Sequence, residues 1–337
     1  MSLNTALYLL VSGLTNGAIY ALLGLGLVLI YNVTRVINIA QGEFVMLGAL
    51  TAVGLSSGGS VGGIYLAIAC GAVWILLEAF RRRNWWLLPL AAAVGVGLWW
   101  LVGWLAPFHF PPLLAAVIAT LVVAFLGAAI YRITIQPAAH ASELIFLIIT
   151  TGLYLGIEGL ALVFWGPSSF SFPSIGAGSL ALGAMHVSFQ SLLVFVATLV
   201  LLFLIWLLLE RTLLGKALRA CAMNRMGSRL VGISPERAGL MAFAISAGLS
   251  AIAGVLIAPI IYATYDMGLF LGLKGFVGAV IGGLSGYGGA VLGGLAVGVL
   301  EAYAYYGISA YGEAIVFALI IVILLFRAVL RNQGRVA

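Results

Sequence analysis

Apolar residues follow one another along this chain in long runs that no charged side chain interrupts. Residues 44–77, 84–131 and 159–209 contain no Asp, Glu, Lys or Arg. Each run is longer than the roughly 20 residues with which an α-helix crosses a bilayer. A transmembrane strand would instead be about ten residues long and would alternate apolar with polar positions. The pattern therefore predicts transmembrane helices.

Short charged clusters and Gly, Pro or Ser breaks separate these runs into successive spans. We expect an all-α fold, a polytopic transmembrane helical bundle with about 9–11 spans, some of them broken or re-entrant. A single transmembrane domain should cover residues 1–337, with a charged cytoplasmic loop at about 210–238. The candidate spans lie near residues 6–30, 37–56, 61–79, 85–105, 112–131, 144–164, 189–209, 239–262, 266–284, 289–306 and 312–330.

Basic residues gather at alternate ends of the predicted spans, and this distribution indicates the orientation. Cytoplasmic loops of membrane proteins carry an excess of Lys and Arg. The rule is satisfied by an external N-terminus and a cytoplasmic C-terminus. In that orientation the cytoplasmic loops hold Arg35, residues 81–83, Arg132, residues 211–237 and residues 327–335.

Three ionisable residues, Glu158, Lys274 and Glu301, fall inside predicted spans, and Lys274 is the exception to the pattern of basic loops. An unpaired charge at membrane depth is costly. Each of these residues therefore indicates either a function or a structural ion pair.

Composition excludes several other classes of protein. Of the 337 residues, 64% are hydrophobic and 7% are charged, so a soluble fold is excluded. The net charge of +6 is carried at the ends of apolar runs, which favours contact with membrane lipid and gives no nucleic-acid surface. The three histidines lack metal-ligand spacing. We expect no metal site, no catalytic residues and no cofactor in this chain.

The charged segment 210–237 reads as two short helices. Residues 216–226 have helix-forming composition, Gly227 and Ser228 can break the helix, and Ser234-Pro235-Glu236 is typical of a helix start. A compact amphipathic knob of this kind suits docking in a groove of a cytoplasmic partner. The alternative is a basic loop that fixes topology and contacts anionic lipid.

Polar residues at 38–43 interrupt an otherwise apolar region. A broken helix there would present free backbone groups to a substrate path. The glycines near residues 282–289 offer a second break, with close helix packing as the alternative. The predicted path residues are Asn38, Gln41, Gly42, Glu43, Gly282, Gly283 and Gly286.

Four stretches of the chain resemble the permease family of branched-chain amino-acid ABC importers. They are GAIYAL at 17–22, NIAQGEF at 38–44, GKALRACA at 215–222 followed by LVGIS, and GFVGAVIGGLSG at 275–286. The resemblance implies the membrane-spanning subunit of an ATP-driven importer for branched-chain or related amino acids in a bacterial inner membrane. It assigns contact with the ATPase to Gly215, Lys216, Arg219, Ala220, Ala222 and Gly232.

Such a subunit implies ABC ATPase subunits that use the ATP, a second identical or homologous permease subunit, and an external substrate-binding protein. This chain itself lacks a nucleotide-binding loop, because Glu210 stands where the first glycine before Gly215 and Lys216 should be. We therefore expect a transport permease that is not an enzyme.

The resemblance has limits and leaves alternatives. It is weak over the Trp-rich residues 61–110, which are interpreted as an added hairpin, and Asn224 and Arg225 stand where the family often has acidic residues. A urea or amide permease of the same family is the first alternative. An ion-coupled secondary carrier that uses Glu158 is the second, and an intramembrane enzyme, for which no catalytic constellation is found, is the third.

Overall fold

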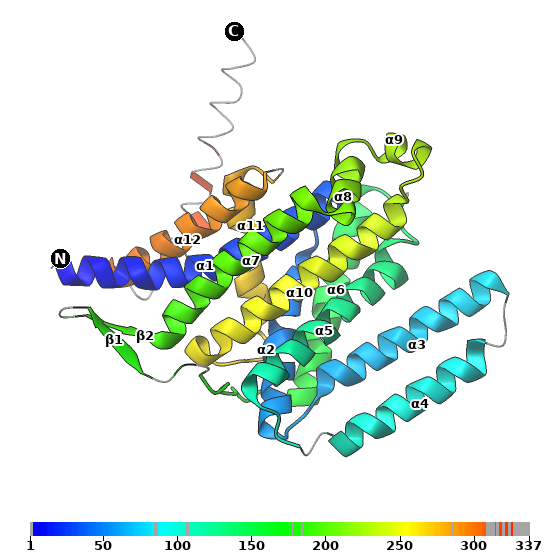
Figure 1. Ribbon diagram of the computed structural model, residues 1–337, viewed down its shortest axis with the longest axis horizontal. Coiled ribbons are helices and arrows are strands. Elements are labelled where there is room, and N and C mark those ends of the chain that lie inside the picture. Colours follow the sequence, from blue (N-terminus) through cyan, green and yellow to red (C-terminus); the bar gives the residue numbers. More distant parts are fainter. Residues whose placement is uncertain are drawn as a thin grey trace, which may run out of the picture.

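The computed structural model describes residues 3–83, 87–105, 108–139, 141–174, 176, 178–182, 185–284 and 286–307, with 314, 317, 318, 321, 322 and 325. The chain forms a bundle of long helices (Figure 1), which confirms the predicted all-α class. The long helices are α1 (Leu3–Thr34), α2 (Glu43–Ser57), α3 (Gly62–Arg82), α4 (Leu87–Leu105), α5 (Pro112–Ile130), α6 (Glu143–Trp165), α7 (Phe189–Arg211), α10 (Pro235–Ile261), α11 (Met267–Gly282) and α12 (Tyr287–Gly307).

Among the described residues, eight helices are long and apolar enough to cross a membrane. The apolar helices α4 and α11 add to these, so the count agrees with the predicted range. The last predicted span, 312–330, lies largely outside the described residues. The protein is therefore a multi-pass membrane protein.

The centre of the bundle consists of α1, α2 and α10, whose side chains are the most buried. Helix α1 packs along α12, α10 and α11, and α10 packs along α2 and α5. Many facing residues are Gly, Ala or Ser, which lets helix backbones approach closely where no hydrophobic effect drives association. This close packing holds the interrupted segment between α1 and α2 in place.

The Trp-rich region forms a helical hairpin at the edge of the bundle, as Figure 1 shows for α3 and α4. Trp99 contacts Tyr65 of α3 with ring centroids 4.4 Å apart. Trp100 remains 78% exposed, and Trp104 63% exposed. The predicted hairpin is confirmed, and its outward indole rings are suited to lipid contact.

The two ends of the bundle differ in chemistry. One end carries the short helices α8 (Leu213–Met223) and α9 (Arg225–Leu230), and there the Arg35 guanidinium donates to the Ala222 carbonyl oxygen over 3.0 Å. The other end carries a hairpin of β1 (Ser179–Leu182) and β2 (Met185–Ser188) (Figure 1). The connection between α6 and α7 thus contains paired strands.

Candidate functional site

The chain is interrupted between α1 and α2, as the sequence predicts. After Thr34, Arg35 adopts a positive φ of 61°, and the chain continues through a 3-10 turn, η1 (Ile39–Gln41), before α2 begins. Asn38, Gln41 and Glu43 are each at most 2% exposed. At membrane depth, irregular backbone needs hydrogen-bond partners inside the protein. The buried polar side chains need such partners as well.

Gln41 attaches this interruption to the middle of α10. Its Nε2 donates to Ser246 Oγ over 2.8 Å and to Ser250 Oγ over 2.6 Å. Asn38 Nδ2 in turn donates to Gln41 Oε1 over 3.5 Å. Both side chains are buried within these contacts, so they position the turn.

Glycines allow the interruption to meet the first turn of α11. A Cβ on Gly42 would overlap the Gly268 carbonyl oxygen and lie 3.0 Å from Gly272 Cα. A Cβ on Gly268 would lie 2.8 Å from the carboxyl carbon of Glu43. Glycine at both positions therefore lets the Glu43 carboxylate lie directly against the start of α11.

Three carboxyl groups gather at this place. Glu43 Oε2 is buried without a hydrogen-bond partner. Glu158 of α6 and Asp266, which precedes α11, both act on Glu43 electrostatically, and Tyr154 lies beside Glu158. Glu158 is half-buried and Asp266 is exposed. We call Glu43, Glu158 and Asp266 the acidic cluster.

No cation of the described residues forms an ion pair with the acidic cluster. No three His, Cys, Asp or Glu residues of this part of the chain are arranged to hold a metal ion. The start of α11 contributes partial positive charge, and Asp266 does not cap it with its side chain. The cluster can therefore attract a cationic group while the helix start attracts an anionic one.

The second glycine-rich segment lies at the opposite end of α11. Helix α11 ends at Gly282, Gly283 adopts a φ of 100°, and α12 begins at Tyr287. A Cβ on Gly282 would overlap the backbone of Gly289, so these helices pack at van der Waals contact. The alternative of close packing is confirmed.

The glycines also mark a break between helices, which lies far along α11 from Gly42. The ten residues from Gly272 to Gly282 rise by about 15 Å along the helix. The turn after Gly282 instead lies at the end that carries α8, where Tyr287 and Arg219 line one cavity of about 450 Å³. Helix α11 therefore leads from the acidic cluster to the turn before α12, and Tyr287 of α12 lines the cavity beside α8.

Lys274 forms a buried ion pair inside the bundle. Its Nζ lies 2.6 Å from Glu301 Oε1, and the Tyr20 hydroxyl donates to Glu301 Oε2 over 2.6 Å. The three residues join α11, α12 and α1. Lys274 is thus no exception to the orientation rule, because its charge is paired within the protein.

The knob, defined as α8 and α9, has the two short helices that the sequence predicts, but its break lies elsewhere. Asn224 has an extended backbone, and its side-chain oxygen accepts from the Gly227 N–H over 2.9 Å. Asn is a strong helix N-cap, so α9 begins here and contains Gly227 and Ser228. The predicted break at Gly227 and Ser228 is wrong. The predicted start of α10 at Ser234 and Pro235 is confirmed.

Large apolar side chains are exposed on the surface of the knob. Side chains that point away from the bundle there are between 71% and 87% exposed. Exposed apolar patches mark sites of contact with another protein or with the membrane. We call them the knob patch, which consists of Leu213, Met223, Met226, Leu230 and Val231.

A protein-family model described as the permease component of branched-chain amino acid transport systems matches residues 9–324. The chain belongs to this family. It is similar to BraD of Pseudomonas aeruginosa, with 29% identity over 94% of this chain and 92% of that protein. It is also similar to LivH of Escherichia coli K12, with 25% identity over 93% and 91%. Both are named high-affinity branched-chain amino acid transport system permease proteins. No solved structure matches the chain significantly.

The predicted coupling residues of the permease differ in their burial and contacts. Gly215 is buried, and a Cβ there would lie 2.5 Å from Leu209 Cα of α7. Arg219 pairs with Glu210 over 2.7 Å. Lys216 and Gly232 are exposed, and Ala220 and Ala222 are half-buried. Gly215 therefore packs the knob onto the bundle.

Sequence reasoning about the permease missed both the knob patch and Asp266. Met226 and Leu230 lie four residues apart inside a basic segment, and this spacing is the signal for an apolar face on α9. Asp266 lies more than 200 residues from Glu43, and local pattern carries no sign of their proximity.

Proposed function

We propose that this chain is the membrane-spanning permease subunit of an ATP-driven ABC importer for branched-chain or related amino acids in a bacterial inner membrane. Family membership supports the class of transport system. The printed names of BraD and LivH support branched-chain amino acids as the substrate. The observation that carries the proposal is the acidic cluster beside the start of α11.

The acidic cluster and α11 together match the charges of a zwitterionic amino acid. Glu158 and Asp266 are accessible to the ammonium group, and the first turn of α11 offers backbone N–H groups and its dipole to the carboxylate. Leu155, 59% exposed, lies three residues before Glu158 on α6 and therefore on the same face. It supplies an apolar wall for a branched side chain.

A second permease subunit, identical or homologous, explains why these carboxylates are accessible. A single chain in lipid would expose Glu158 and Asp266 to hydrocarbon at membrane depth, which is costly. A facing subunit encloses the same surface in a water-filled path. The start of α11 and the acidic cluster then lie between the two subunits.

ATPase subunits bind the knob in this proposal and hydrolyse the ATP. The knob patch gives their groove an apolar helix face, and the exposed Lys216 adds positive charge on the same knob. Because α12 lines the cavity beside α8 and packs along α11, movement of the knob reaches the substrate site through these two helices. An external substrate-binding protein delivers the amino acid at the end that carries β1 and β2.

The orientation follows from the same assignment, with the N-terminus outside and the C-terminus in the cytoplasm. The arginine-rich end with the knob is cytoplasmic because basic residues are retained on that side.

Uptake of radiolabelled leucine by cells that co-express the ATPase, the second permease and the binding protein tests the function. Leucine uptake that requires all four components supports it. Urea uptake without leucine uptake would show that the substrate is an amide. Leucine uptake without the ATPase would show that the protein is a secondary carrier.

A further inference from the structure

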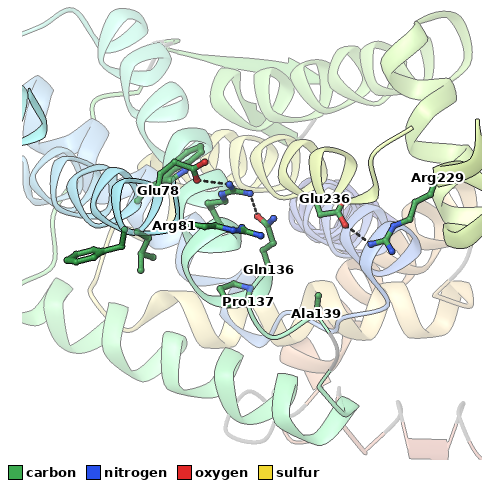
Figure 2. A pocket seen from close by; sticks show the side chains of 11 residues that line it. Glu78, Arg81, Gln136, Pro137, Ala139, Arg229 and Glu236 are labelled. Atoms are coloured by element: carbon green, nitrogen blue, oxygen red, sulfur yellow. Dashed lines mark hydrogen bonds and ion pairs between the residues drawn. The ribbon is translucent and has the colours of Figure 1, made fainter. Parts of the chain in front are cut away.

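A cavity of about 660 Å³ lies at the arginine-rich end of the bundle, apart from the acidic cluster and from the knob patch. It is bounded by α3, the π-helical turn η2 (Tyr131–Ile135), α9 and the start of α10. Figure 2 shows Glu78, Arg81 and Gln136 on one side of this space and Glu236 and Arg229 on the other.

The charged part of the lining is positive. Arg132 lies 2.7 Å from Glu78 Oε2, and Arg229 lies 2.6 Å from Glu236 Oε1. Arg81 lines the same cavity and is exposed, and in the described part of the chain no ion pair holds it. Three guanidinium groups therefore face two carboxylates, which leaves an excess of positive charge for an anion.

The wide turn η2 presents two of these polar groups side by side. The Gln136 N–H donates to the Tyr131 carbonyl oxygen over 2.8 Å, five residues back. The Arg132 guanidinium donates to Gln136 Oε1 over 2.6 Å, which leaves the planar group fixed toward the cavity. π-helical turns of this kind occur frequently at functional sites.

The other part of the lining is apolar. Trp74 stacks on Phe125 of α5 at 6.1 Å between ring centroids, while Leu77 is 45% exposed and Phe80 61% exposed. These α3 residues precede Arg81 along the helix, so they lie on the membrane side of the guanidinium groups. The cavity thus lies at the edge of the bundle and has two parts. One part is lined by guanidinium groups, and the part on the membrane side is apolar.

We propose that this cavity binds the head group of an anionic phospholipid from the surrounding leaflet. The guanidinium groups of Arg81 and Arg229 contact the phosphate oxygens, since planar guanidinium matches phosphate geometry. The acyl chains lie along Leu77 and Phe80. Basic pockets between transmembrane helices near the cytoplasmic surface are suited to this ligand. A lipid bound here connects the edge helix α3 with α9 and so supports the base of the knob.

Native mass spectrometry of the purified full-length permease, incubated with phosphatidylglycerol or with phosphatidylcholine of the same acyl chains, tests this proposal. We expect preferential retention of phosphatidylglycerol. Arg81→Gln should weaken that retention roughly five-fold, because one basic residue near an anionic lipid surface contributes about that factor. Arg211→Gln, which changes an exposed arginine at the end of α7, is the matched control and should retain the lipid as the wild type does.

A gain-of-binding variant separates lipid binding from misfolding. Glu78→Gln removes a competing carboxylate and frees Arg132, so retention of phosphatidylglycerol should rise. Equal retention of both lipids by the wild type would overturn the proposal, as would unchanged retention in Arg81→Gln. Full displacement of phosphatidylglycerol by inorganic phosphate would assign the cavity to a free anion. That result would also overturn lipid binding.

Discussion

Glu158 and Glu143 lie on the same helix, α6, but only Glu158 belongs to the acidic cluster. If the cluster binds the substrate ammonium group, Glu158→Gln should raise the apparent KM for leucine roughly ten-fold, as expected for loss of one hydrogen bond to a charged group. Initial rates of leucine uptake measure this. Glu143→Gln is the control and should transport as the wild type does. Equal KM values for the wild type and Glu158→Gln would place substrate recognition elsewhere.

A substitution at Gly268 tests the contact between α11 and Glu43. A methyl group at Gly268 would meet the Glu43 carboxylate and displace it, so Gly268→Ala should strongly reduce leucine uptake. Gly152→Ala on α6 adds the same group where no atom lies within 4 Å, and it should have little effect. Membrane insertion of both variants is compared by immunoblot. Normal uptake in Gly268→Ala would show that this close contact is not needed.

A substitution at Gln41 distinguishes residues that position the turn between α1 and α2 from residues that bind the substrate. Gln41→Leu removes the hydrogen bonds to Ser246 and Ser250 and the acceptor for Asn38 Nδ2, and it leaves these polar groups buried, so it should destabilise the protein by about 1–3 kcal/mol. The melting temperature in detergent should fall together with uptake. In Glu158→Gln uptake should fall at an unchanged melting temperature. A normal melting temperature for Gln41→Leu would contradict the positioning role.

At the level of elements, the knob patch carries the expected contact with the ATPase. Met226→Asp together with Leu230→Asp puts two charges into an apolar interface, so leucine-stimulated ATP hydrolysis by the assembled transporter should be lost. Leu230→Met keeps the surface apolar and is the matched control. The variant protein should still be inserted, because both side chains are more than 70% exposed. Full stimulation in the double variant would exclude the knob patch as the docking surface.

Sequence pattern predicts the elements well where capping and polarity are local. Ser234 and Pro235 begin α10 as expected, and the polar residues 38–43 interrupt α1 and α2. The predicted break in the knob is misplaced because glycine is typical of a helix break, whereas Asn224 caps a helix that contains Gly227. The position of Gly282 relative to Gly42 depends on the direction of α11 in the bundle. Tertiary packing determines this direction, and local sequence pattern does not.

At the scale of the whole molecule, the distribution of charge predicts the class and orientation before any contact is known. Apolar runs give the spans, and arginine clusters give the side on which each loop lies. The meeting of Glu43, Glu158 and Asp266 comes from three distant parts of the chain. Packing of glycine surfaces brings them together, and a sequence pattern does not encode which surfaces meet.

Cysteine labelling tests the orientation in a variant without Cys70 and Cys221. Gly59→Cys lies in the exposed connection between α2 and α3, and Met223→Cys lies on the knob with 87% exposure of the native side chain. In intact cells a membrane-impermeant maleimide should modify only Gly59→Cys. In inside-out vesicles it should modify only Met223→Cys. The reverse result would invert the orientation.

The most direct test of the account is uptake by proteoliposomes that contain the purified permease, a second permease subunit and the ATPase subunits, with the binding protein and radiolabelled leucine outside. We expect leucine to accumulate only in proteoliposomes that contain ATP in the lumen, with the knob facing that lumen. We also expect the Met226→Asp and Leu230→Asp double variant to abolish accumulation. Leucine accumulation without ATP, driven by an ion gradient alone, would contradict it.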